Sequence, residues 1–246
     1  MTNHWPKIRT VGVTGMLVSF ADALSEPSNR AALAFRARVE REGWDGVEET
    51  SSTLASTFVR FDPLALSHAT LRMRLEGLLA EADWYAAPPP QGRRFWRIPA
   101  VFGTDLAPQL DQAAQAAGLT SEAAIAELSA ARVRVITLGF AAGQSYLGEL
   151  PEAWNLPRQT GLTPRVAEGA LVVAIRQFVL FATSAPTGWQ HVAQTAFKSF
   201  RPDHPEPFAL CAGDEVQFEP VTREAFEAIR AQDTSGNGGA VVEVIR

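Results

Sequence analysis

Three consecutive prolines, at positions 88 to 90, constrain this 246-residue chain more than any other feature. A proline has no backbone N–H and fixes φ, so a run of three cannot lie in a helix or in the middle of a sheet. Residues 86–92 therefore predict an extended linker between two domains. We place an N-terminal α+β domain at residues 1–87 and a C-terminal domain at residues 88–230.

The last part of the chain has the composition of a linker. Residues 232–239 are rich in glycine and small polar residues, which favour a flexible coil. We therefore predict a flexible C-terminal tail at residues 231–246. Within it, residues 241–245 either pair as an edge strand or lie loose.

Strand and helix patterns alternate in the N-terminal domain. Branched apolar residues at 11–20 predict a strand, and the helical repeat that follows ends at Gly43. Residues 47–50 and 53–61 read as a hairpin, and Ser67 is suited to cap a second helix with a leucine stripe. The order strand, helix, strand, strand, helix is most of a ferredoxin-like unit, in which two helices cover one face of an antiparallel sheet.

Short strand patterns dominate the C-terminal domain. Residues 94–98 predict a strand, Asp105 is expected to cap a helix to about Ala117, and a second helix is expected at residues 121–130. The further strand candidates are residues 133–138, 170–182, 189–195 and 215–220. Short strands separated by glycine and proline turns suggest a small closed barrel, which leaves no exposed sheet edge.

Composition excludes several classes of function. The net charge is −5 without a basic cluster, which argues against a nucleic-acid partner. No apolar run reaches the roughly 18 residues of a membrane helix, and the N-terminus lacks a signal-peptide core. The single cysteine, Cys211, has apolar neighbours, which favours a buried and inert thiol in a reducing compartment. We therefore expect a cytoplasmic protein with no membrane partner.

A glycine-rich loop at residues 138–151 is the best candidate for a ligand site. Gly139 and Gly148 can adopt backbone conformations closed to other residues, while Phe140 and Tyr146 supply apolar walls. The alternative is a plain structural turn.

The chain contains no recognisable catalytic motif. Ser145 lies between two glycines, but the second glycine falls one residue too late for a nucleophile elbow. The four histidines are scattered singly, so no metal site is predicted, and no phosphate loop for ATP occurs. The sequence therefore names no base or nucleophile, and we expect no cofactor to be bound by this chain alone.

Two arginines are candidates for holding an anionic substrate. Arg158 and Arg165 flank a turn, and a guanidinium can hold a carboxylate through two parallel hydrogen bonds. The alternative is that each is a surface charge, paired with Glu149, Glu152 or Glu168.

Gln177 is the third polar candidate. It lies in the apolar run at residues 172–181, where an amide must find hydrogen-bond partners or cost stability. It either lines a ligand site or joins barrel strands.

The glycine-rich loop resembles that of a known family. Residues 138–140, 146–148 and 150–151 are similar to the signature loop of the 5-oxoprolinase B-subunit family, also called allophanate hydrolase subunit 1. The other similar segments, in the family's order, are residues 61–63, 98–99, 164–166, Gly169, Gln177, 186–189 and 212–218. The resemblance covers about residues 10 to 230 and implies a cyclophilin-like β-barrel for the C-terminal domain.

The resemblance also implies an activity and partners. It points to the B subunit of an ATP-dependent 5-oxoprolinase. This subunit acts with an A subunit and a C subunit, the latter similar to allophanate hydrolase subunit 2, to hydrolyse the 5-oxoproline lactam to glutamate, with ATP used by the assembly. Arg158 or Arg165 would hold the substrate carboxylate, and Gly139 and Gly148 would offer main-chain amides to an oxyanion. The implied substrate-binding residues are Gly139, Phe140, Tyr146, Gly148, Arg158, Arg165, Gln177, Gly188 and Trp189.

The chain departs from the family pattern near this site. Ile175, Arg176 and Val179 stand where the family has glycines, and residues 194–196 have lost an arginine and a proline. Larger side chains fill space that glycine leaves open, so we expect a smaller or differently shaped pocket.

Two other functions remain open from sequence. Some relatives resemble inhibitors of a sporulation histidine kinase, so the chain could be a regulatory binding module. The carboxyltransferase portion of biotin-dependent urea carboxylase is also similar, but nothing in this chain carries biotin, and we rank that function last.

Overall fold

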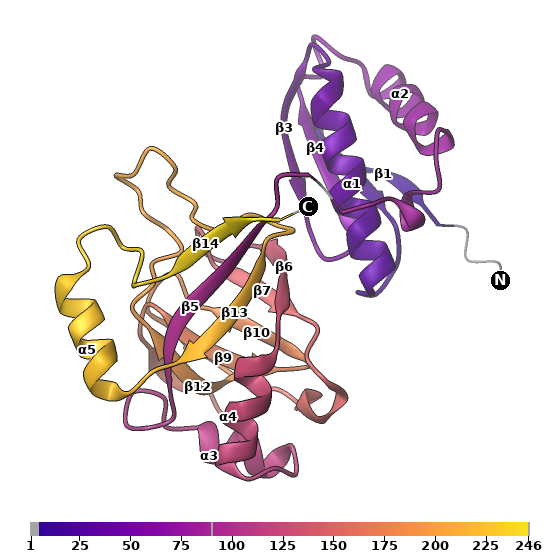
Figure 1. Ribbon diagram of the computed structural model, residues 1–246. Coiled ribbons are helices and arrows are strands. Elements are labelled where there is room, and N and C mark those ends of the chain that lie inside the picture. The colour runs from indigo at the N-terminus through magenta and orange to yellow at the C-terminus, as the bar shows by residue number, and fades with distance from the viewer. Residues whose placement is uncertain (1–4, 90, 246) are drawn as a thin grey trace. The chain divides into compact units, whose positions relative to one another are not determined.

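The computed structural model describes residues 5–89 and 91–245, which form two compact units (Figure 1). The first unit is Met1–Gln91 and the second is Gly92–Arg246. The division falls inside the proline-rich segment, of which Pro90 lies outside the described residues. Among the described helices, none is long and apolar enough to cross a membrane.

The first unit is a four-stranded antiparallel sheet with two helices on one face (Figure 1). The sheet order is β1-β2-β4-β3, and helices α1 and α2 follow β2 and β4. The elements are β1 (Lys7–Val11), β2 (Gly15–Ser19), α1 (Glu26–Glu42), β3 (Val47–Ser52), β4 (Ser56–Phe61), α2 (His68–Ala80) and a 3-10 turn (Trp84–Ala86). The ferredoxin-like arrangement is confirmed, with β1 as the fourth strand beside β2.

The prediction of one strand at residues 11–20 is wrong. The chain forms two antiparallel strands, in which Val11 pairs with Gly15 across a tight turn. Gly12 has φ +62° in that turn, a conformation that glycine adopts without steric cost. The apolar pattern did not indicate this turn, because Val13, which is exposed at the tip of the turn, is itself apolar.

Helix α1 begins and ends where its sequence directs. The Ser25 side chain accepts a hydrogen bond from the Ser28 N–H, the Ser28 hydroxyl accepts one from the Ser25 N–H, and Pro27 lies in the first turn. Gly43 ends the helix in the left-handed conformation. The helix then buries Phe35 against Trp84, with ring centroids 5.1 Å apart.

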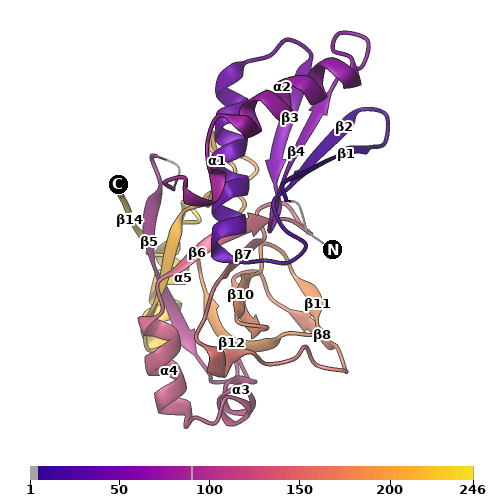
Figure 2. The same cartoon turned by 90° about the vertical axis from the view of Figure 1, so that its right-hand side faces the viewer.

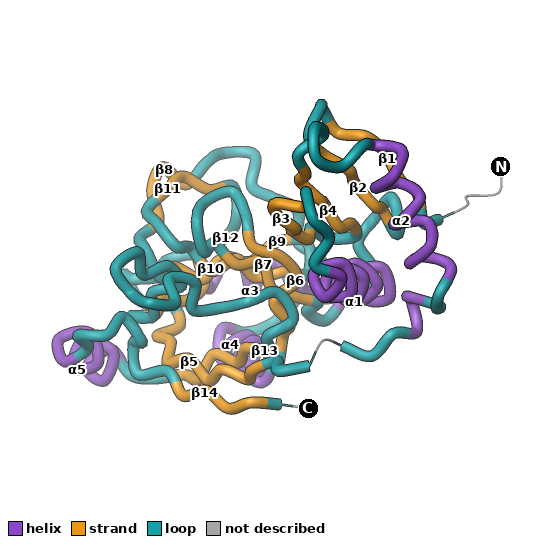
Figure 3. Tube along the Cα trace, turned by 90° about the horizontal axis from the view of Figure 1, so that it is seen from above, coloured by secondary structure: helices purple, strands orange, loops and turns teal. Residues whose placement is uncertain are grey.

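The second unit is a closed barrel of seven strands with a further strand, β14, at its edge (Figure 3). The sheet order is β12-β9-β10-β7-β6-β13-β5, and the pairing of β5 with β12 closes the ring. The barrel strands are β5 (Arg94–Phe102), β6 (Val133–Leu138), β7 (Ser145–Gly148), β9 (Ala170–Ala174), β10 (Gln177–Leu180), β12 (Gln190–Thr195) and β13 (Glu215–Pro220). The other elements are α3 (Leu110–Ala116), α4 (Ser121–Ala130), a 3-10 turn (Glu152–Trp154), β8 (Thr163–Val166), β11 (Ala185–Thr187), α5 (Arg223–Gln232) and β14 (Val241–Val244).

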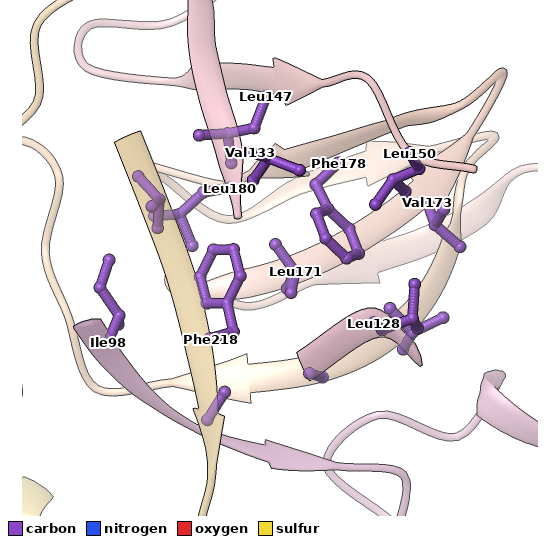
Figure 4. Close-up of a cluster of buried hydrophobic side chains, with 14 of the residues drawn as sticks. Ile98, Leu128, Val133, Leu147, Leu150, Leu171, Val173, Phe178, Leu180 and Phe218 are labelled. Carbon is purple, nitrogen blue, oxygen red and sulfur yellow. The ribbon is translucent and has the colours of Figure 1, made fainter. Parts of the chain in front are cut away.

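Side chains fill the barrel interior. Alternate residues of the strands point inward, and the rings of Phe178 and Phe218 meet edge to face with centroids 5.7 Å apart (Figure 4). Leu147, Leu171 and Leu180 complete this packing and are fully buried. The interior is therefore a hydrophobic core, and a ligand site must lie elsewhere.

The predicted strand at residues 170–182 is two strands joined by a tight turn. β9 and β10 pair antiparallel, and the turn residues Ile175 and Arg176 have φ +43° and +60°. Neither residue is a glycine, so no local signal in the sequence marks this turn. Backbone bonds from Ile175 N–H to Leu156 and from Arg176 N–H to Trp154 hold it in place.

One further prediction for the second unit is wrong, and one open alternative is decided. Helix α3 begins at Leu110 rather than after Asp105, because Pro108 disfavours helical geometry in the residue before it. The C-terminal tail begins with the end of α5, and β14 within it pairs antiparallel with β5, so the edge strand considered for residues 241–245 is present. The amide of Gly238 donates to Asp233 in this tail. Burial raises the pKa of Asp233, but hydrogen bonds to its carboxylate outweigh that effect and leave the pKa below its ordinary value.

Asp214 joins three strands of the barrel. Its buried carboxylate accepts hydrogen bonds from the Arg94 backbone N–H at 2.9 Å, from the Arg94 guanidinium at 2.6 Å and from the Cys211 N–H at 3.0 Å. Its own carbonyl accepts the Val135 N–H of β6 at 2.7 Å. Asp214 therefore fixes the start of β13 against β5 and β6.

We predict that Asp214→Ala destabilises the second unit by about 3 kcal/mol or more, because it leaves a half-buried guanidinium and two amides without their acceptor. The free energy of unfolding from urea titration measures the loss. Asp105→Ala is the matched control: it removes a carboxylate paired with Arg223 in solvent, so stability should hardly change. Equal effects of the two substitutions would contradict the role given to Asp214.

Candidate functional site

The strands β7, β10 and β9 are apolar on the outer face of the barrel as well as on the inner face. Outward side chains such as Tyr146 and Val179 form a second cluster with Phe181 and Trp189. Val166 of β8 and Ala185 of β11 pack on this cluster, and β8 and β11 pair as a small separate sheet (Figure 2). Burial on both faces explains the nearly unbroken apolar run in the sequence here.

A cavity of about 280 Å³ lies on this outer face. It lies where the loop before β7, the segment before β8 and the segment between β11 and β12 meet. Its lining residues are Phe140, Gln144, Tyr146, Arg158, Gln159, Leu162, Val179, Phe181, Pro186, Thr187, Gly188 and Trp189. We call it the outer-face cavity.

Aromatic rings and one cation dominate the outer-face cavity. The rings of Tyr146 and Trp189 meet edge to face with centroids 6.3 Å apart. The Arg158 guanidinium lies 5.3 Å from the centroid of the Trp189 ring, at cation–π distance. The two turns around Tyr146 and Trp189 therefore meet at one cavity.

Arg158 is available to a ligand. Within the described chain it forms no ion pair, and its side chain is exposed. The surface pairing considered from sequence does not occur, because Glu149 and Glu152 both pair with Arg176, at 3.8 Å and 3.1 Å. Arg158 thus retains its full capacity to bind a carboxylate.

Gln144 lines the cavity and has a buried hydrogen-bond acceptor without a partner. The residue is 2% exposed, and its side-chain oxygen has no partner among the described atoms. A buried acceptor without a partner costs about 1–3 kcal/mol. A ligand N–H that reached this oxygen would recover that free energy.

Phe140 stands at the rim of the cavity in an unusual conformation. Its φ is +72° and its side chain is 80% exposed. A positive φ in a bulky residue costs on the order of 1–2 kcal/mol. Because the Phe140 ring is exposed, no hydrophobic burial offsets this cost. Leu162, 67% exposed, lies on the same lining, so the rim presents two apolar side chains to solvent.

Two glutamines hold the segments of the cavity together. The Gln159 side chain donates to the Trp189 carbonyl at 2.9 Å, and its backbone N–H donates to the Gly188 carbonyl at 2.6 Å. The Gln109 amide donates to the Gln159 side-chain oxygen at 3.0 Å and accepts the His191 N–H at 2.8 Å. This pair positions Arg158, which neighbours Gln159, beside Trp189.

The structure gathers five of the nine residues predicted for the site. The residues that line the outer-face cavity are Phe140, Tyr146, Arg158, Gly188 and Trp189. Of the other four, Gly139 uses its amide to close the loop, by donating to the Gln144 carbonyl at 3.0 Å, so that amide does not face an oxyanion.

Gly148, Gln177 and Arg165 lie away from the cavity lining. Gly148 and Gln177 are directly paired between β7 and β10, and neither lines the outer-face cavity. Arg165 lines a different cavity, and its guanidinium donates to the Ser184 hydroxyl at 2.7 Å. Of the two arginines predicted to hold a carboxylate, only Arg158 is at the outer-face cavity.

Sequence reasoning missed Gln144 and Gln159 as site residues. Gln144 was part of the glycine-rich loop and Gln159 part of the turn between the two arginines, and neither was singled out. Val179, noted as a replacement for a glycine, lines the cavity and occupies part of its volume. A sequence signal existed for Gln144 in its position between two glycines of the loop.

The described residues near the cavity lack the groups of hydrolytic chemistry. The lining contains no carboxylate, imidazole, thiol or amine. Ser145 is fully buried, and its hydroxyl donates to the Gly143 carbonyl at 3.2 Å, so it is not positioned as a nucleophile. In the part of the chain that the structure describes, no group of three or more metal-ligating residues occurs. The outer-face cavity can bind and orient a ligand but offers no base.

The prediction that Cys211 is buried is wrong. The residue is exposed rather than buried, because it begins the tight turn to Asp214 at the start of β13. Its backbone N–H donates to the Asp214 carboxylate at 3.0 Å.

A second cavity of about 410 Å³ shares no lining residue with the first. It contains His191, which is 5% exposed and whose Nε2 atom has no hydrogen-bond partner among the described atoms. Burial disfavours the charged imidazolium and lowers the pKa of His191 to about 4. The ring is therefore neutral at neutral pH.

Comparison with known proteins identifies the family. Residues 6–210 match the carboxyltransferase domain, subdomain C and D, and the chain belongs to this family. Its particular relatives include the 5-oxoprolinase B subunit of Bacillus subtilis (strain 168), which is 27% identical over 92% of this chain and 97% of the relative. The 5-oxoprolinase B subunit of Haemophilus influenzae is 34% identical over 65% of this chain and 70% of the relative.

Solved structures share the fold. TTHA0988 is 27% identical, with a TM-score of 0.72 over 88% of this chain, and the chain spans 40% of that protein. The urea carboxylase of Kluyveromyces lactis superimposes with a TM-score of 0.73 over 97% of this chain and 24% of its own, at 20% identity. The predicted α+β fold class, with a ferredoxin-like domain followed by a cyclophilin-like barrel, is thereby confirmed.

The buried neutral His191 predicts a specific pH dependence of stability. Its pKa is about 4 when folded against 6.5 when unfolded, so the unfolded state binds the proton first as pH falls. The contribution of neutral His191 to stability is fully present above its pKa in the unfolded state and is lost as pH falls toward its pKa in the folded state. The free energy of unfolding should therefore fall by about 2 kcal/mol between about pH 7 and about pH 5.

The measurement is the free energy of unfolding of the wild type and of His191→Gln across this pH range. On acidification the variant should lose about 2 kcal/mol less stability than the wild type, because it lacks the imidazole that takes up the proton. His204→Gln is the matched control, because His204 is exposed and should leave the pH dependence unchanged. Parallel curves for wild type and His191→Gln would rule out this account.

Proposed function

We propose that this chain is the B subunit of an ATP-dependent 5-oxoprolinase and that its outer-face cavity binds 5-oxoproline. One observation carries the proposal: a single aromatic cavity is lined both by Arg158, a cation that forms no ion pair, and by Gln144, whose side-chain oxygen has no hydrogen-bond partner. The same lining contains no catalytic base. The relatives named as 5-oxoprolinase B subunits support the same assignment.

The carboxylate of the ligand belongs at Arg158. A planar guanidinium offers two parallel N–H donors to a carboxylate, and these charge-assisted bonds are among the strongest in proteins. The cation–π contact with Trp189, at 5.3 Å, uses none of the guanidinium N–H donors in a hydrogen bond, so these donors serve the ligand. Gln159, held by Gln109, fixes the backbone beside Arg158.

The lactam of the ligand belongs at Gln144. A lactam presents an N–H donor and a carbonyl acceptor on adjacent atoms of a small ring. The Gln144 side-chain oxygen accepts the N–H, while Tyr146 and Trp189 flank the apolar ring carbons. A site built around a ligand N–H discriminates strongly against an analogue that lacks it.

The chemical step belongs to the assembly. A lactam is a stable amide, and transfer of the terminal phosphoryl group of ATP to its oxygen, with release of ADP, makes the ring carbon electrophilic. One water then adds to this carbon and the C–N bond breaks to give γ-glutamyl phosphate, and a second water hydrolyses this acyl phosphate to glutamate and phosphate. The cavity supplies neither a base nor a phosphate-binding loop, which supports a division of labour with the A and C subunits. The exposed side chains of Phe140 and Leu162 at the rim are suited to contact one of these partners.

We predict that Arg158→Gln weakens binding of 5-oxoproline by about tenfold or more, because it removes charge-assisted hydrogen bonds worth roughly 1.5–3 kcal/mol. Arg158→Lys should recover only part of the affinity, since lysine keeps the charge but not the planar fork. Isothermal titration calorimetry of the purified chain, or KM of the reconstituted assembly, measures the effect. Arg165→Gln is the matched control and should bind normally.

The proposal as a whole is tested by omission. The A and C subunits with 5-oxoproline and ATP should turn over substrate only when this chain is present. Unchanged turnover without this chain would refute the assignment, whereas turnover that is lost without it but insensitive to Arg158→Gln would refute only the location of the site.

We predict that Gln144→Leu abolishes discrimination between the lactam and its lactone analogue, in which oxygen replaces the ring N–H. The wild type should prefer the lactam by about tenfold or more, because the lactone leaves the Gln144 oxygen without a donor. Competition between the two ligands, followed by calorimetry, reports the ratio. An undiminished preference in the variant would show that another group reads the N–H.

A further inference from the structure

The second cavity has charges of both signs with no partner in the described chain. The terminal NH₂ groups of Arg165, the ammonium group of Lys198 and the carboxylate of Glu168 make no ion pair and no hydrogen bond to described residues. The other charged residues of the lining are paired: Asp105 with Arg223, and Arg230 with Glu227. Two cations and one anion are therefore available to a ligand.

Neutral polar groups form the buried part of the same cavity. Gln194 is buried and fixed by its bonds to the Glu168 and Thr195 carbonyls, at 2.7 Å and 3.0 Å. His191 contributes a neutral ring whose Nε2 atom lacks a partner among the described atoms. A ligand would thus meet a hydrogen-bonding group inside the cavity and opposite charges at its mouth.

We propose that the second cavity is a binding site for a small acidic amino acid. Arg165 and Lys198 match two carboxylates, Glu168 matches one ammonium group, and His191 provides a neutral hydrogen bond. The Nε of Arg165 donates to the Ser184 hydroxyl, which fixes the side chain and leaves the two terminal groups of the guanidinium for a carboxylate. The volume of about 410 Å³ accommodates a molecule of this size.

The site is independent of the outer-face cavity but adjoins it. Gln109 lines the second cavity and donates to Gln159, which lines the first. Gln109 also accepts the His191 N–H and the Thr163 hydroxyl, at 2.8 Å and 3.4 Å. The proposed reaction releases an acidic amino acid, yet the site is inferred from the second cavity alone and stands whether or not that reaction is correct.

Calorimetric titration of the purified chain with L-glutamate, L-glutamine and glutarate tests the proposal. Glutamate should bind with one site per chain, while glutamine, which lacks the second carboxylate, and glutarate, which lacks the ammonium group, should each bind about tenfold more weakly. Absence of glutamate binding, or equal binding of the three ligands, would overturn the proposal.

Substitutions locate the site. Arg165→Gln and Lys198→Gln should each weaken glutamate binding about tenfold, and Glu168→Gln should remove the preference for glutamate over glutarate. Arg74→Gln makes the same charge change at a residue that does not line the cavity and should have no effect; circular dichroism verifies that each variant is folded. Unchanged glutamate affinity in Arg165→Gln and Lys198→Gln would overturn the location.

Arg158→Gln separates this proposal from the function proposed above. It should weaken 5-oxoproline binding and leave glutamate binding unchanged. If this variant bound neither 5-oxoproline nor glutamate, glutamate would occupy the outer-face cavity, and the proposal of a second site would be overturned.

Discussion

The second unit depends on strand β5, because one nine-residue strand pairs with three others. Its first half pairs with β14, its second half with β12, and β13 runs parallel along its length. The carboxylate of Asp214 binds the backbone and the guanidinium of Arg94, the first residue of β5, and so fixes the register of β5 against β13. Charge-assisted bonds in a buried position resist slippage more than neutral bonds do, since any slip leaves a buried carboxylate without partners.

Closure of the barrel decides where a ligand can bind. Because the interior is packed with side chains such as Phe178 and Phe218, the strands can offer a site only on their outer face. There β8 and β11 cover one part of β9 and β10, and the uncovered part becomes the outer-face cavity. Residues of β8 also line the second cavity, so both sites follow from the same arrangement of strands.

Much of the fold could be predicted from local patterns. The cap of α2 at Ser67, the end of α1 at Gly43 and the strand β13 follow from capping chemistry and apolar periodicity, which act over a few residues. The turn at Ile175 and Arg176 could not be predicted, because neither residue favours positive φ and the turn is held by backbone bonds to Leu156 and Trp154. The candidate site was predicted in part: the loop around Tyr146 and the segment at Trp189 were found through resemblance, but Gln144 and Gln159 were not.

The sequence by itself determined the two-unit division, most helices and strands and the family to which the chain belongs, since these depend on composition, spacing and motifs along the chain. Only the tertiary structure decided which polar residues share a cavity. It placed Arg158 with Trp189 and moved Arg165 to a different cavity, although the two arginines flank one short turn. The physical reason is that a cavity is bounded by segments distant in sequence, and strand pairing and the alternation of side chains between the two faces of a sheet decide which of them meet.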